Sequence, residues 1–150
     1  MMSLMKTGEP LGKRQIELLR DSFVAVLLDQ ERAGRLFYDR LFAIAPDVRA
    51  MFGQEMAAQR RILIQTLATI VTGLGDVATL RPMIAALGRR HVGYGVRPEH
   101  YAPVGEAIIH MVAGMGGAAL EAETERAWRI GYGFVAGEMT AAGRMGQPAT

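Results

Sequence analysis

Apolar residues recur along most of this chain three and four positions apart, the spacing that places them on one face of an α-helix. In the first such stretch, Ile16, Leu19, Phe23, Val26 and Leu27 share a face. The chain has no sustained alternation of apolar and polar residues and no Asn-Gly or Asp-Gly turn, so strands are not expected. The pattern predicts an all-α protein.

Glycine and proline divide this pattern into about seven helices around one core. The predicted helices are 13–29, 31–45, 47–52, 55–74, 80–91, 98–115 and 120–142. Pro46 and Pro98 stand at predicted helix starts, where the missing N–H of proline costs nothing. We therefore expect a flexible N-terminal tail (1–12), one folded domain (13–143) and a frayed C-terminal tail (144–150).

Composition excludes several classes of chemistry. A chain of 150 residues fits one domain, and its lack of cysteine excludes disulfides, thiolate metal sites and cysteine nucleophiles. With only three histidines, a cluster of several histidines around a metal is not expected. The net charge is +2 and basic residues form no run longer than a pair, which argues against nucleic-acid binding. No membrane-spanning stretch or secretion signal is visible, so we expect a cytoplasmic protein.

One histidine falls on the core-facing side of a predicted helix. Leu87, Ile84 and Leu80 precede His91 by four, seven and eleven residues, so His91 stands at the end of their apolar stripe. A single imidazole in such a place is more often a buried, hydrogen-bonded histidine than a metal ligand. Spacing alone leaves both interpretations open.

Two other polar residues share this unusual position. Gln59 lies four residues before Leu63 on the stripe of the long helix, and Tyr38 lies four residues before Phe42. Burying an unpaired polar group costs about 1–3 kcal/mol, so each calls for a partner or for access to solvent. Together with His91 they suggest a cavity with a basic nitrogen on one side and hydrogen-bond donors on the other. Spacing does not show whether they meet.

Five segments resemble the globins in the order and near the spacing found in that family. They are LFYDRLFAIAPDVRAMF (36–52), QRRILIQTLATIV (59–71), LGRRHVGYGV (87–96), HYAPVGEAII (100–109) and AWRIGYGFVAGEM (127–139). The resemblance extends over about 14–142 and is greatest to bacterial single-domain globins, including neuroglobin-like and flavohaemoglobin-type ones. It implies the globin fold, a three-on-three helical sandwich, around haem b (Fe-protoporphyrin IX).

The resemblance also assigns roles to individual residues. His91 matches the proximal histidine, the ligand of the haem iron, and Tyr38 and Gln59 match the distal residues that contact a bound gas. Further expected haem contacts are Phe42, Phe52, Leu63, Leu87, Val96, Tyr101 and Val104. His100 is expected to face solvent. Arg89 or Arg90, and Arg60 or Arg61, are candidates for the haem propionates.

One element of the flavohaemoglobin-like pattern is missing. Such globins tie the proximal histidine to a tyrosine and a glutamate, and Tyr101 matches the tyrosine. Gly143 stands where the glutamate should be, and Glu138 is about one turn too early. The resemblance therefore leaves the complete triad, and the peroxide-type chemistry it favours, in doubt.

The expected ligands are O₂, NO and CO. Two distal donors would stabilise the negative charge that bound O₂ acquires, which favours tight oxygen binding. Tight binding suits O₂ scavenging or conversion of NO to nitrate, the latter with an unidentified external reductase. The alternative is a non-enzymatic protein for oxygen storage or transport. A gas sensor, which would need an output domain, and a haem-free helical bundle are less favoured.

Overall fold

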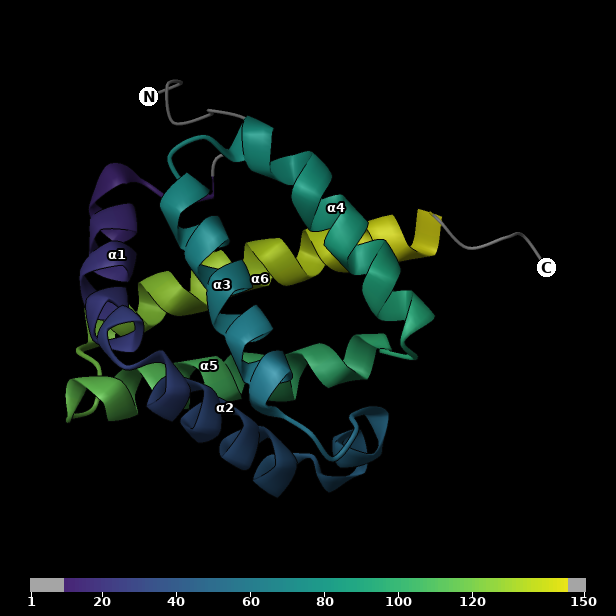
Figure 1. Cartoon of the computed structure of the whole chain (residues 1–150). Coiled ribbons are helices and arrows are strands. Elements are labelled where there is room, and N and C mark those ends of the chain that lie inside the picture. The colour runs from purple at the N-terminus through teal and green to yellow at the C-terminus, as the bar shows by residue number, and fades with distance from the viewer. Residues whose placement is uncertain (1–9, 146–150) are drawn as a thin grey trace.

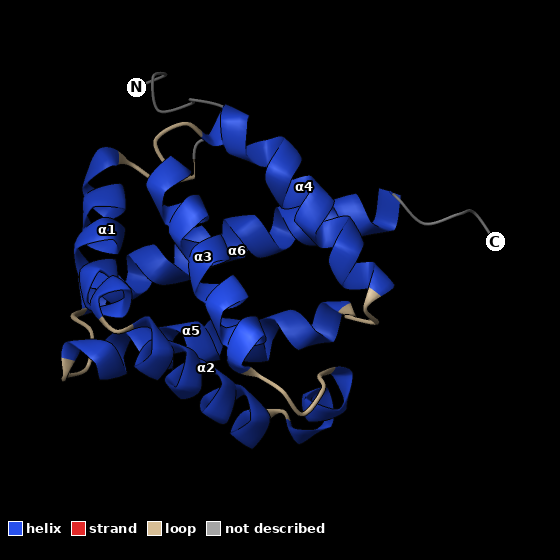
Figure 2. Ribbon diagram, viewed as in Figure 1, coloured by secondary structure: helices blue, strands red, loops and turns tan. Residues whose placement is uncertain are grey.

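The computed structural model describes residues 10–145, which form helices joined by short loops (Figures 1 and 2). Within that range no strand occurs, which confirms the all-α prediction. Of the two predicted tails, 1–9 and 146–150 lie outside the described residues. The helices are α1 (Lys13–Leu28), α2 (Gln30–Ile44), η2 (Pro46–Met51), α3 (Ala57–Gly73), α4 (Val77–Gly93), η3 (Pro98–His100), α5 (Tyr101–Gly116) and α6 (Ala122–Met145).

Helix boundaries differ from the prediction where a polar side chain caps a helix. Helix α4 begins three residues before position 80, because Asp76 accepts hydrogen bonds from the backbone N–H and the hydroxyl of Thr79 at 3.3 and 2.6 Å. Helix α3 begins two residues after position 55, because the Glu55 carboxylate instead accepts the N–H of Ala57 at 2.7 Å. The short segment after Ala45 is a 3₁₀ helix.

The helices pack in two layers. Helices α1, α3 and α4 lie across α2, α5 and α6, with the most extensive contacts between α4 and α6 and between α2 and α5 (Figure 1). This confirms the three-on-three sandwich. The fully buried side chains at its centre include Phe23, Ile64, Ile84 and Met111. No helix in the described range is long and apolar enough to cross a membrane.

Helices α1 and α6 are joined by a partly buried hydrogen bond as well as by apolar contact. The indole Nε1 of Trp128 on α6 donates to Ser22 Oγ on α1 at 2.8 Å. The Ser22 hydroxyl in turn donates to backbone oxygens of its own helix. The ring of Phe23 lies 6.0 Å from that of Trp128. This chain of bonds satisfies the indole N–H in the core.

A tyrosine links α6 to α5. The hydroxyl of Tyr132 donates to the backbone oxygen of Tyr101 at 2.6 Å. Its ring lies against Gly105, where a Cβ would come within 2.8 Å of ring atom Cε2, so a glycine is needed there. Burial raises the pKa of the Tyr132 hydroxyl well above its ordinary value, and the nearby Tyr101 adds to the shift. The phenol therefore stays protonated as a donor over a wide pH range.

Replacing Tyr132 by Phe should reduce stability at pH 7 by about 1 kcal/mol, the typical net worth of one hydrogen bond. The difference between the proteins should shrink above about pH 10. There the unfolded wild type releases the Tyr132 proton while the folded wild type retains it, so stability is lost as pH rises. Urea unfolding at about pH 7 and pH 10.5 measures both values.

Tyr94→Phe, which removes a phenol that is 66% exposed, should leave stability unchanged at pH 7. A difference between wild type and Tyr132→Phe that grows with pH would contradict this expectation.

Candidate functional site

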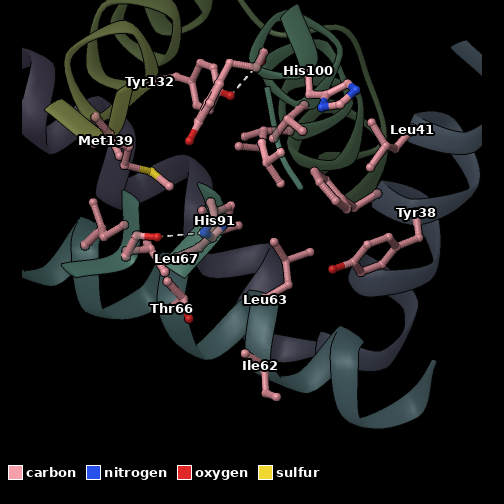
Figure 3. Close-up of a pocket in the computed structure, with 18 of the residues that line it drawn as sticks. Tyr38, Leu41, Ile62, Leu63, Thr66, Leu67, His91, His100, Tyr132 and Met139 are labelled. Atoms are coloured by element: carbon pink, nitrogen blue, oxygen red, sulfur yellow. Dashed lines mark hydrogen bonds between the residues drawn. The ribbon is translucent and has the colours of Figure 1, made fainter. Parts of the chain in front are cut away.

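A largely apolar cavity of about 650 Å³ lies inside the sandwich. Residues from α2, η2 and α3 form one wall, and residues from α4, α5 and α6 form the other (Figure 3). The polar residues that line it are Tyr38, Gln59, Thr66, Arg90, His91, Tyr94, His100, Tyr101, Trp128 and Tyr132. A large apolar space with a few convergent polar groups is the usual form of a ligand or cofactor site.

On one wall His91 presents a single nitrogen to the cavity. The Nδ1 atom lies 2.8 Å from the backbone oxygen of Leu87, one turn earlier on α4. Because a carbonyl oxygen can only accept, Nδ1 carries the proton and Nε2 keeps its lone pair. Burial lowers the pKa of His91, an effect that the bond to Leu87 partly opposes. The ring is therefore neutral near pH 7 and its Nε2 is suited to bind a metal.

On the other wall Tyr38 and Gln59 form a pair. The amide Nε2 of Gln59 donates to the Tyr38 hydroxyl oxygen at 3.2 Å. The hydroxyl therefore keeps its own proton, and Figure 3 shows it pointing toward the space that Leu63 and His91 also border. Burial raises the pKa of Tyr38 despite the opposing effect of Gln59. The phenol is a neutral donor facing the cavity.

Most of the residues predicted from the resemblance line this cavity. In addition to Tyr38, Gln59 and His91, they are Phe52, Leu63, Leu87, Val96, Tyr101 and Val104. Phe42 is the exception. Its ring lies 5.7 Å from the rings of both Tyr38 and Phe52, and it is not among the lining residues. Phe42 supports the wall from behind instead of forming it.

An arginine packs against the ring of Phe42. The guanidinium of Arg49 lies 5.2 Å from the centre of the Phe42 ring. Its Nη1 atom donates to the backbone oxygens of Phe52 and Gly53 at 3.2 and 3.0 Å. Arg49 thereby ties the chain after η2 to the aromatic cluster of Tyr38, Phe42 and Phe52.

Helix α6 contributes lining residues that were not predicted from the sequence. Five residues of this helix line the cavity, namely Trp128, Gly131, Tyr132, Val135 and Met139. They recur three, four and seven positions apart, so they share one face of the helix. That spacing marks a buried face, but it does not distinguish a face against the core from a face against a cavity.

The structure corrects the expected position of His100 and narrows the choice among the four candidate arginines. His100 was expected to face solvent, but it is half-buried and lines the cavity, with its Nδ1 accepting the backbone N–H of Arg97 at 2.9 Å. Of the four candidate arginines, Arg90 is the one that lines the cavity. Arg60 pairs with Glu31 at 3.0 Å, and Arg61 and Arg89 are exposed.

Around His91 no carboxylate takes the place of the expected glutamate. Gly143 is buried, and a Cβ there would come within 2.6 Å of Val92 Cγ2, so this position has no room for a side chain. Glu138 lies 3.5 Å from Arg81, with which it forms an ion pair. Among residues 10–145 no three His, Cys, Asp or Glu side chains gather as a metal site, so His91 would act as a lone protein ligand.

Known proteins resemble this chain in sequence and in fold. The chain is 29% identical to a flavohemoprotein of Rhodopirellula baltica over 129 residues, which are 84% of this chain and 32% of that protein. It is 25% identical to a neuroglobin of Dissostichus mawsoni, over 88% of this chain and 92% of that one. A bacterial globin structure from Campylobacter jejuni superposes with a TM-score of 0.77, at 23% identity, over 89% of this chain and 97% of that chain.

The flavohemoproteins are much longer, and this chain spans about a third of their length. The sequence pattern of the globin family itself matches residues 35–139, from α2 to the cavity-lining face of α6. The chain therefore belongs to the globin family.

Proposed function

We propose that this globin holds haem b in the cavity through His91, binds O₂ tightly beside Tyr38 and Gln59, and uses that O₂ to convert NO to nitrate. The observation that carries the proposal is that a neutral imidazole and a pair of hydrogen-bond donors border one apolar cavity. Family membership implies the haem.

The residues present fit this cofactor. Its flat, largely apolar ring suits a cavity with mostly apolar walls, and Arg90 and His100, two lining residues that reach solvent, are candidates to bind its carboxylates. The lone pair of His91 Nε2 is available because Nδ1–H is committed to Leu87. Ferrous haem supplies an iron position that binds one molecule of O₂, NO or CO.

The distal residues favour O₂ over ligands that acquire less negative charge. Tyr38 donates its hydroxyl proton toward the ligand, and Gln59 holds the phenol oxygen in place through its amide. These donors act in a cavity with mostly apolar walls, where a hydrogen bond to a partial charge is stronger than in water. Such a site retains O₂ instead of releasing it readily.

The proposed reaction balances as NO + O₂ + e⁻ → NO₃⁻. The chain's own part is to retain O₂ until NO arrives and to exclude bulk water from the cavity. The electron comes from a reductase partner that returns the iron to its ferrous state. Tight retention favours this reaction over oxygen storage, because a storage protein must release its ligand on demand.

Replacing His91 by Ala should abolish the intense Soret absorption that the wild type develops with haemin, together with its shift on reduction by dithionite. The cavity would lose the nitrogen that holds the iron. His110→Ala is the matched control, because His110 is an exposed histidine on α5 and its loss should change neither spectrum. Haem spectra and affinity that are the same in His91→Ala and wild type would exclude His91 as the ligand.

Tyr38→Phe and Gln59→Leu should each accelerate release of O₂ from the ferrous protein by about tenfold. Tyr38→Phe removes the hydroxyl that donates to O₂, and Gln59→Leu removes the amide that holds this hydroxyl in place. Release is measured by stopped-flow displacement with CO. Gln65→Leu, which changes an exposed glutamine on the same helix as Gln59, should have the wild-type rate. Unchanged rates in both distal variants would show that the pair does not face the ligand.

The ferrous protein equilibrated with O₂ should form one nitrate per iron when mixed with NO, and become ferric. Adding NADH and a flavin reductase should make NO consumption continuous. Nitrate analysis and an NO electrode follow the two stages. Failure of the reductase to restore the ferrous spectrum or to sustain nitrate formation would favour the alternative role in oxygen storage.

A further inference from the structure

Helix α4 rests directly on the backbone of α6 at Gly88. A Cβ atom at this position would overlap the carbonyl oxygen of Met139 and lie 2.6 Å from its Cα atom. Ordinary carbon contacts are about 3.5–4.0 Å. Because the obstructing atoms belong to the backbone, no change of side-chain rotamer can make room. The two helices approach as closely as they do because residue 88 has no side chain.

A second close contact, this time against a side chain, lies one turn further along both helices. A Cβ at Gly143 would come within 2.6 Å of Val92 Cγ2 and 3.5 Å of the Gly88 oxygen. Gly88 and Val92 are four residues apart on α4, and Met139 and Gly143 are four residues apart on α6. One turn of α4 therefore lies on one turn of α6, as their crossing in Figure 1 also shows.

His91 belongs to this same turn of α4. It follows Gly88 by three residues and directly precedes Val92. The carbonyl that holds its Nδ1 belongs to the peptide unit that joins Leu87 to Gly88. The contacts at Gly88 and Val92 lie before and after His91 in the chain. Together they fix the distance of this turn of α4 from α6 and the rotation of α4 about its helix axis. The rotation determines where the imidazole points.

We propose that Gly88 and Gly143 are positioning residues that set how far His91 Nε2 reaches into the cavity, and in which direction. This inference rests on the proposed role of His91 as the haem ligand. According to this inference, the geometry of the iron–histidine bond depends on the contact between α4 and α6.

Gly88→Ala tests this directly. The added methyl group must displace α4 by about 1 Å, since the Met139 backbone cannot yield. The iron–histidine stretching band in the resonance Raman spectrum of the ferrous protein should shift, and haem should bind about tenfold more weakly. Gly93→Ala on α4 and Gly137→Ala on α6 are matched controls, because a Cβ at either position meets nothing within 4 Å. Both controls should keep the wild-type band.

Two double variants distinguish a change in the position of His91 from a general loss of packing. Gly143→Ala should also shift the band, and adding Val92→Ala should restore it, because Val92 Cγ2 is the obstructing atom. Adding Met139→Ala to Gly88→Ala should not restore it, because the obstruction there is backbone. If Gly88→Ala does not fold, the Gly143→Ala and Val92→Ala pair decides the question alone.

The outcomes distinguish this inference from the proposed function. A wild-type protein with the iron–histidine band and glycine variants with the same band would overturn the inference and leave the proposed function standing. Restoration of the Gly88→Ala band by Met139→Ala would also overturn the assignment to the backbone contact. A wild-type protein that binds haem without this band would overturn the proposed function and the inference together.

Discussion

The chemistry of the cavity depends on the hydrogen bond from His91 Nδ1 to the Leu87 carbonyl. It fixes the proton on one nitrogen of the ring and leaves the other with a free lone pair. Burial keeps the ring neutral near pH 7 by lowering its pKa, so the lone pair is not lost to a proton. A carbonyl is a weaker partner than a carboxylate, so the imidazole would donate less electron density to a metal than a carboxylate-bound one.

The two walls of the cavity depend on different kinds of support. His91 is held by its own helix and by the packing of α4 on α6, which are rigid elements. The distal wall depends on side chains that support each other: Gln59 bonds Tyr38, and the rings of Phe42 and Phe52 pack against Tyr38. Arg49 closes this cluster by bonding the backbone at Phe52. The wall that carries His91 is thus held mainly by backbone contacts, whereas the wall that carries Tyr38 and Gln59 is held by side-chain packing.

Helical periodicity was sufficient to predict the all-α fold and the inward orientation of His91, because both follow from local spacing. It could not show that Tyr38 and Gln59 face His91, since that depends on how α2 and α3 cross. Helix starts were misplaced at Asp76 and Glu55, where polar caps outweigh the apolar pattern. Spacing also could not show that Phe42 packs on Tyr38 and Phe52 without lining the cavity, because that depends on how the chain continues from α2 through η2.

The position of Trp128 has a practical consequence for study of this molecule. It is the chain's one tryptophan, and its indole borders the same cavity as His91 while its N–H is bonded to Ser22. Any occupant that absorbs near 340 nm will accept its excitation energy over so short a range. The intrinsic fluorescence of the protein is therefore a built-in gauge of whether the cavity is filled, readable without a label.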